Sequence, residues 1–296
     1  MAAHRHVDAI CICVTLLTLL VTLLFMQGEK FGLQPYVDPD AEEYVGTEHF
    51  TVNDQRGDWN SKSATRIELL GDHARVRGGG AYAVDGNVFI NSAGRYVLTG
   101  TLENGSITVD TNKKAKVWIL LAGADIRCDH DACIRVEQVA KLFLTLEEGT
   151  ENRLYCAGIS ELALAEGVDG AIFSRDNLTI NGGGCLTVSA DQEHGIAGND
   201  LLKFTGGEIS VSAPGDALHV SDGVYLMNAA LRLAAGDDGI SVNEKDGGFY
   251  MESGSLQIEA EDKGIRVNGK AELLGGEVEI LAGGDRIEEF AVSYSA

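Results

Sequence analysis

The sequence predicts an all-β protein built as a parallel β-helix, because short apolar strands and acidic turns recur along it at a nearly constant spacing. In the C-terminal half, a small residue followed by an apolar one returns at intervals of about 22 to 25 residues. Apolar and polar residues alternate within the strands, as in Leu178 and Ile180 and again in Leu186 and Val188. One such repeat is too small to bury its own apolar face. We therefore expect the coils to stack about 4.8 Å apart, with their strands pairing in parallel.

Two sets of small residues mark each coil. The first set lies at the start of a short strand, at Gly170, Gly195, Ala217, Gly239, Gly264 and Arg286, where only the last departs from a small side chain. The second set falls where the chain must bend between faces, which glycine permits through positive φ: Gly182-Gly183, Gly206-Gly207, Ala229-Ala230, Gly254-Ser255 and Gly275-Gly276. Strand-like segments upstream extend the pattern. We expect one domain over residues 65–296, with about ten coils of about 22 residues each.

The first sixty-four residues differ from the repeats. The run from Ala9 to Met26 is apolar apart from three threonines, and about 1.5 Å of rise per residue makes it long enough to cross a bilayer as a helix. Arg5 precedes this run, and no clear cleavage motif follows it, so residues 1–30 are predicted to be a signal anchor. A cleaved signal peptide is the alternative. Residues 31–64 are acidic and contain two prolines, which predicts a tether. The location expected is the extracellular face of the cell membrane, or the medium if the signal is cleaved.

Composition excludes several classes of partner. The chain has 45 acidic and 23 basic residues and a formal net charge of −22, so it repels nucleic acids and anionic lipid head groups. The predicted membrane contact is through the N-terminal helix only. Six cysteines leave the redox state open, since Cys128 and Cys133 are spaced for a local disulfide but equally suit free thiols. Gly-rich phosphate loops, G-x-S-x-G and paired CxxC motifs are absent from the sequence.

Stacking of the coils brings equivalent turn residues over one another, and most of these are acidic. Two full charges about 4.8 Å apart repel by about 1 kcal/mol even in water, and binding of a hard dication lowers this cost. Calcium suits such flexible oxygen sites better than magnesium does. Asp and Asn are also ordinary turn residues, so a solvated acidic rim is the alternative, with His194 and Lys263 as internal counter-ions. The predicted calcium ligands are Asp169, Asp216, Asp237, Asp238, Asp262 and Asp285.

Several segments together resemble a known family, the bacterial exported carbohydrate-binding β-helix domains whose fold is similar to that of pectate lyases. The likeness lies in GRYVLTGTLENGSITVDT, LEEGTENRL, DNLTINGGGCLTV and the DDGI and GGE repeats, and covers residues 66–282. It implies a right-handed, single-stranded β-helix that binds calcium and plant-type polysaccharides. In the family, acidic residues of the DDGI type bind calcium. This carries over to Asp237 and Asp238 and, where the pattern is looser, to Asp169, Asp216 and Asp285. The sequence departs from the family pattern at Lys263, Ala217 and Arg286.

The predicted function is non-catalytic, calcium-dependent binding of a polysaccharide at the cell surface. An acidic, pectin-like chain would need dications to bridge it to this acidic protein, whereas cellulose would use hydrogen bonds and ring stacking. A polysaccharide lyase acting on uronic-acid chains, with Lys263, Arg266 or Arg286 as the base, is one alternative. A structural or adhesive surface solenoid is the other. The residues predicted to bind carbohydrate are Asp200, Asp222, Asn243, Asn268, Tyr225 and Tyr250.

Overall fold

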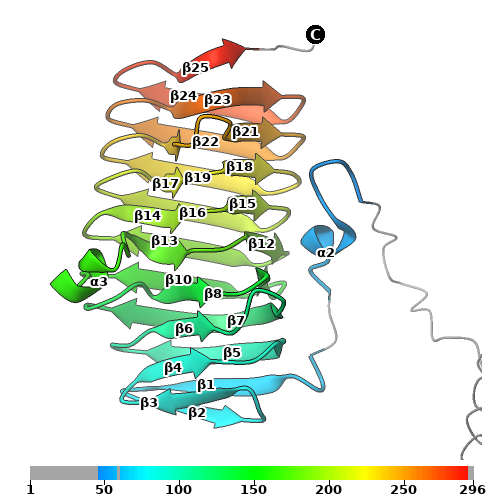
Figure 1. Cartoon of the computed structure of the whole chain (residues 1–296), viewed down its shortest axis with the longest axis vertical. Coiled ribbons are helices and arrows are strands. Elements are labelled where there is room, and N and C mark those ends of the chain that lie inside the picture. The colour runs from blue at the N-terminus through cyan, green and yellow to red at the C-terminus, as the bar shows by residue number, and fades with distance from the viewer. Residues whose placement is uncertain (1–45, 59–60, 293–296) are drawn as a thin grey trace, which may run out of the picture. The chain divides into compact units, whose positions relative to one another are not determined.

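The computed structural model describes residues 46–58 and 61–292, and these form a parallel β-solenoid of about eight turns (Figure 1). Each turn contributes strands to three faces, which we number in chain order. Face 1 contains β4 (Asn87–Ile90), β6 (Ile107–Asp110), β8 (Ile134–Gln138), β11 (Gly170–Ser174), β14 (His194–Gly198), β17 (Leu218–Val220) and β20 (Ile240–Val242). Face 2 contains β9 (Lys141–Leu146), β12 (Leu178–Gly182), β15 (Leu201–Phe204), β18 (Gly223–Leu226) and β21 (Gly248–Met251).

Face 3 holds the longer strands β10 (Glu151–Cys156), β13 (Cys185–Ala190), β16 (Glu208–Ala213), β19 (Ala230–Ala235), β22 (Ser255–Ala260) and β24 (Glu277–Ala282). Five strands run around a corner without a break. β1 (Thr65–Gly71), β5 (Gly94–Leu102) and β7 (Lys116–Cys128) pass from face 2 into face 3, whereas β23 (Ile265–Leu273) and β25 (Ile287–Val292) pass from face 1 into face 2. Antiparallel pairs with β2 (Ala74–Arg77) and β3 (Ala81–Val84) cap the first coil.

The core is made of inward side chains stacked from coil to coil. On face 1 the parallel register places Ile172, Ile196, Leu218, Ile240 and Ile265 one above another, and none of them is more than 1% exposed. Burial of one such side chain contributes about 1.5–3 kcal/mol relative to leaving it in water. The sequence prediction of stacked parallel strands is therefore confirmed.

Two details differ from the sequence prediction. There are about eight turns instead of ten, because some early coils are longer than 22 residues. Thr145 and Asn181, for example, occupy equivalent places in adjacent coils and are joined by a hydrogen bond, yet they are 36 positions apart. That coil accommodates α3 (Glu161–Ala165) in the loop before face 1. In addition, Gly170 pairs with His194 and not with Gly195, which shifts the register of the first marker by one residue. The later markers pair as predicted.

An N-terminal strap, residues 46–58, lies against the outer side of face 2. Its one helical turn, α2 (Val52–Gln55), is closed by a capping box in which Thr51 and Asp54 bond to each other's backbone N–H. These residues fall within the predicted tether, so this part of it is docked on the solenoid. Within the described residues, no helix has the length and apolarity needed to span a bilayer. The predicted transmembrane segment, residues 9–26, lies outside that part of the chain.

The cysteines that the structure describes are all free thiols. Cys128, Cys133 and Cys156 are buried among the coils, and Cys185 is partly exposed. Burial raises the pKa of Cys156 to about 11, so this thiol is protonated at neutral pH. A local disulfide between Cys128 and Cys133, one of the two possibilities that the sequence left open, is not formed here.

Candidate functional site

The corner between faces 3 and 1 carries the predicted acidic column, and its members do lie in successive coils. Three of its side chains each accept a hydrogen bond from a backbone N–H of the next coil. His194 Nδ1 accepts from Asp216 at 2.9 Å, Asp216 Oδ1 from Asp238 at 3.0 Å, and Asp238 Oδ1 from Lys263 at 3.0 Å. The column is thus a ladder of side-chain acceptors that satisfies backbone donors at the turns, which is one physical reason for acidic residues there.

The second oxygen of each buried aspartate is bound by a residue of face 1. His219 Nδ1 lies 2.6 Å from Asp216 Oδ2, and Arg266 Nε donates to Asp238 Oδ2 at 2.5 Å. Asp216 and Asp238 are only 1% and 2% exposed, so these bonds offset the desolvation of their charges. The hydrogen bond to Asp216 also raises the pKa of His219. His219 was not among the residues predicted to form a site, and Arg266 was named only as a candidate base for the lyase alternative.

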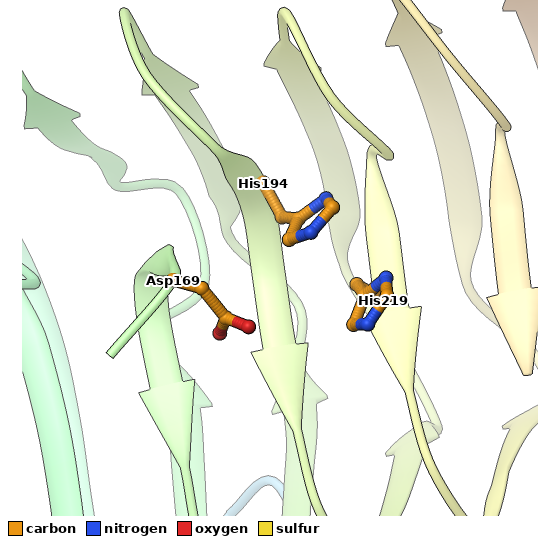
Figure 2. Close-up of side chains that lie close together, drawn as sticks. All are labelled: Asp169, His194 and His219. Carbon is orange, nitrogen blue, oxygen red and sulfur yellow. The ribbon is translucent and has the colours of Figure 1, made fainter. Parts of the chain in front are cut away.

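Asp169 lies at the edge of this ladder and is bonded differently (Figure 2). The backbone N–H of His194 donates to the carbonyl oxygen of Asp169, not to its side chain, and Asp169 Oδ1 is buried without a hydrogen-bond partner. The one-residue register shift at Gly170 accompanies this difference. Burial raises the pKa of the Asp169 carboxyl, as expected for an unsatisfied acid. The rings of His194 and His219 stack beside it, with centroids 4.0 Å apart and planes 14° apart.

The six predicted calcium ligands do not form one site. Asp216, Asp237 and Asp238 each bring one oxygen within 4.8 Å of the others, which fits a single oxygen-coordinated cation. Arg266 already neutralises Asp238, and burial raises the pKa of Asp237. Asp169 lies with the histidines, Asp262 pairs with Lys263, and Asp285 is exposed near the last coil.

The predicted carbohydrate ligands are divided between two other places. Asp200 and Asp222 lie at the corner between faces 1 and 2, where burial and the neighbouring Asp222 raise the pKa of Asp200. Asn243 and Asn268 stack at the end of face 1, with Asn268 Nδ2 donating to the Asn243 carbonyl oxygen at 2.6 Å. These four residues therefore lie along one corner, and the two predicted tyrosines lie elsewhere, on face 2.

Tyr225 and Tyr250 form an aromatic shelf on face 2, and the strap covers it. His49 lies 4.0 Å from Tyr250 and 5.2 Å from Tyr225 between ring centroids, and Phe50 lies 6.1 Å from Tyr250. Tyr250 is only 9% exposed. A sugar ring can stack on this shelf only where the strap has moved away.

A groove along the outer side of face 3 was not predicted. It consists of two adjoining hollows of about 410 and 560 Å3 that cross β13, β16, β19, β22 and β24. Outward side chains form two rows along it. One row contains Thr187, Ser210, Arg232, Gln257 and Glu279, and the other contains Ser189, Ser212, Ala234, Glu259 and Leu281.

Three residues of the first row are linked by hydrogen bonds across the coils. Arg232 Nε donates to Gln257 Oε1 at 3.2 Å, and Gln257 Nε2 donates to Glu279 Oε2 at 3.3 Å. The sequence feature that could have revealed this row is the polar residue that recurs at one outward position of each face 3 strand. Ser and Thr are so common at exposed strand positions that sequence reasoning gave them no special role.

The sequence and the fold have relatives. A family model described as "Carbohydrate-binding domain-containing protein" matches residues 84–295. A curated protein of that same description from Acetivibrio thermocellus is 35% identical over 128 residues, which cover 43% of this chain and 45% of the relative. The matched part thus spans less than half of that relative's length.

A solved structure described as a polysaccharide lyase-like protein from C. thermocellum, in a gadolinium derivative, has a similar fold. It superimposes with a TM-score of 0.76 at 27% sequence identity, covering 78% of this chain and 97% of that chain.

Proposed function

Because this chain belongs to the family of carbohydrate-binding domain-containing proteins, we propose that it binds a polysaccharide along the face 3 groove without cleaving it. The observation that carries the proposal is the repetition of polar side chains along the groove. An extended glycan lying across the coils meets a hydroxyl, amide or guanidinium group at each step of about 4.8 Å. Such repeated hydrogen bonds are suited to a polymer of identical units.

A neutral glucan of the cellulose type fits this groove better than an acidic chain does. Glu259 and Glu279 line it, and among the described residues that line it Arg232 is the only basic one and already bonds to Gln257. Uronate carboxylates would meet these glutamates, and the protein as a whole carries a charge of −22. Neutral hydroxyl groups encounter no such repulsion.

Calcium-dependent binding of a pectin-like chain is the second candidate. It is favoured by the three carboxylates of Asp216, Asp237 and Asp238, which lie close enough to share a cation. Asp237 is the exposed member and would be the one to face a bound glycan. Calcium at this corner would link the glycan's carboxylates to those of the protein.

Lyase activity at the acidic corner has less support. Proton abstraction needs a base that can lose its proton near neutral pH. Burial opposes the charge of Arg266, but its bond to Asp238 raises the pKa of the guanidinium above the usual value. Arg266 also donates to Ser241 at 2.6 Å, so it is held as an ion-pair partner.

The test is co-sedimentation of the purified full chain with swollen cellulose and with calcium pectate. We expect binding to cellulose that EDTA leaves unchanged and that Arg232→Ala and Gln257→Ala each weaken several-fold. Arg75→Ala, which removes an exposed arginine from the capping hairpin, is the matched control. Loss of pectate binding in EDTA would favour the second candidate. Failure of both glycans to bind, or growth of unsaturated uronide absorbance, would contradict the proposal.

A further inference from the structure

We propose that Asp169, His194 and His219 form a binding site for a divalent transition-metal ion of the zinc type, separate from the face 3 groove. One ligand atom from each residue lies within 4.8 Å of the other two. For any triangle with sides of this size, some point lies within about 2.8 Å of all three corners, and metal–nitrogen bonds of about 2.0–2.1 Å need only a modest contraction. Figure 2 shows the three side chains on adjacent coils, with the Asp169 carboxylate directed toward the imidazoles.

The unsatisfied carboxylate is an independent observation that points to a ligand. Asp169 Oδ1 is the only buried side-chain oxygen or nitrogen in the described part of the chain that has no hydrogen-bond partner. Burying a polar atom without a partner costs about 1–3 kcal/mol, and a metal ion would satisfy it. The other carboxylates buried in this corner, those of Asp216 and Asp238, have partners for both oxygens.

His219 has the support that metal-binding histidines usually have. Its Nδ1 bonds to Asp216 Oδ2 at 2.6 Å, which places the proton on Nδ1 and leaves the Nε2 lone pair for a metal. Asp216 is buried, so it fixes the ring's orientation as well as its tautomer. Asp216 therefore acts as a positioning residue.

Two present contacts must change when the metal binds. Asn243 Nδ2 lies 3.0 Å from His219 Nε2 and must withdraw. His194 Nδ1 now accepts a hydrogen bond from the Asp216 N–H, so it is Nε2 that carries the proton. For Nε2 to bind a metal, the proton must move to Nδ1. The ring must then rotate so that this Nδ1–H points to Asp216 Oδ2, which is now 3.7 Å away. Asp216 would then hold both rings. These rearrangements reduce affinity, and we expect a dissociation constant in the micromolar range, about −8 kcal/mol.

The chemistry of the ligands selects the ion. Two imidazoles and one carboxylate suit zinc, nickel, copper and iron, whereas calcium and magnesium take oxygen ligands. Millimolar calcium should therefore leave this site accessible to zinc. The three protein ligands leave further positions on the ion for water.

The experiment is titration of the untagged full chain, purified in detergent, with Zn2+ by calorimetry and with Co2+ by visible absorbance. We expect one equivalent of Zn2+ to bind in the presence of excess Ca2+, and Co2+ to give visible bands of a nitrogen-ligated ion. Asp169→Asn and His219→Gln should each weaken binding at least tenfold. Asp216→Asn should weaken it about 10- to 100-fold and shift the Co2+ bands.

Asp169→Asn is the decisive variant because the oxygen that it changes has no partner to lose, so folding should be preserved. His73→Gln, which alters an exposed histidine paired with Asp72, is the matched control and should bind as the parent chain does. Absence of Zn2+ binding would overturn the proposal. Binding that Asp169→Asn and His219→Gln leave unchanged would also overturn it, since the ion would then be held elsewhere.

Discussion

Asp54 and Lys141 lie 87 positions apart in the chain and form an ion pair on face 2, in which the carboxylate is fully buried. The same carboxylate accepts a hydrogen bond from Thr179 at 2.8 Å and lies 3.6 Å from the ammonium of Lys203. One strap residue is thus connected to three strand residues in three successive coils. This cluster holds residues 46–58 over the aromatic shelf of Tyr225 and Tyr250.

Replacing Asp54 with alanine should release the strap. Two largely buried lysines would then lack their counter-ion, and breaking a buried pair typically costs about 3–5 kcal/mol, an upper value here because the strap can detach and admit water. We expect a lower melting temperature and faster proteolysis within residues 46–58. Asp58→Ala, which alters an exposed strap residue, is the control and should have little effect. Equal proteolysis of the two variants would contradict this account.

Acid should weaken the strap in the same way. Burial opposes ionisation of Asp54, but attraction to Lys141 and several hydrogen bonds outweigh it and hold the pKa of the carboxyl below its usual 3.8. Because the pKa of Asp54 is lower in the folded than in the unfolded chain, its ionised carboxylate stabilises the fold above pH 3.8. This stabilisation is lost as the pH falls through the pKa of the folded chain. The stability difference between the parent chain and Asp54→Asn should therefore shrink below pH 3.8. A difference that stays constant from pH 7 to pH 2 would disprove this linkage.

Gly182 and Gly183 form a matched pair for testing the bend between faces 2 and 3. Gly182 has φ +101°, and a Cβ built on it would lie 2.2 Å from the Leu146 carbonyl oxygen. Gly183 lacks positive φ, and its nearest contact would be the Glu148 side chain at 3.4 Å. Gly182→Ala should lower the free energy of unfolding by more than about 1–2 kcal/mol, which is the cost of a left-handed backbone for an L-residue, because the new Cβ also collides with Leu146. Gly183→Ala should change the free energy of unfolding by less than that, as urea denaturation can measure.

Arg266 should compete with calcium for the acidic corner. Its guanidinium is bonded to Asp238, so a cation entering between Asp216, Asp237 and Asp238 must meet a positive charge already in place. Arg266→Met should raise calcium affinity several-fold by removing that charge while retaining much of the side chain's bulk. Arg286→Met, at the last coil, is the comparison. Calorimetric titration with Ca2+ measures both, and unchanged affinity in Arg266→Met would indicate that calcium does not bind at these carboxylates.

The solenoid could be predicted because the sequence pattern that specifies it, short apolar strands between small or acidic turn residues, is local and recurs in each coil. Spacing alone placed Asp216, Asp238 and Lys263 in successive coils, and the structure confirms that they lie together. The resemblance to carbohydrate-binding domains with a β-helix fold is likewise confirmed, by the family match and by the solved structure of similar fold. Each conclusion depended on a pattern that returns several times, so no single residue decided it.

What lay outside that pattern needed the tertiary structure. No repeat relates Asp54 to Lys141 or His49 to Tyr250, since one member of each pair belongs to a segment that occurs once. His219 lies three positions beyond the acidic column, and only the folded coil shows that its ring stacks on His194.

The stacking of coils of similar length follows from the amino-acid sequence, because burying each apolar strand requires a neighbour above and below it. Which polar groups meet is seen only in the folded chain, as in the one-residue shift at Gly170, the docked strap and the face 3 groove. The physical reason is that apolar burial constrains every coil in the same way, whereas a polar contact depends on the particular register and side-chain direction at one place.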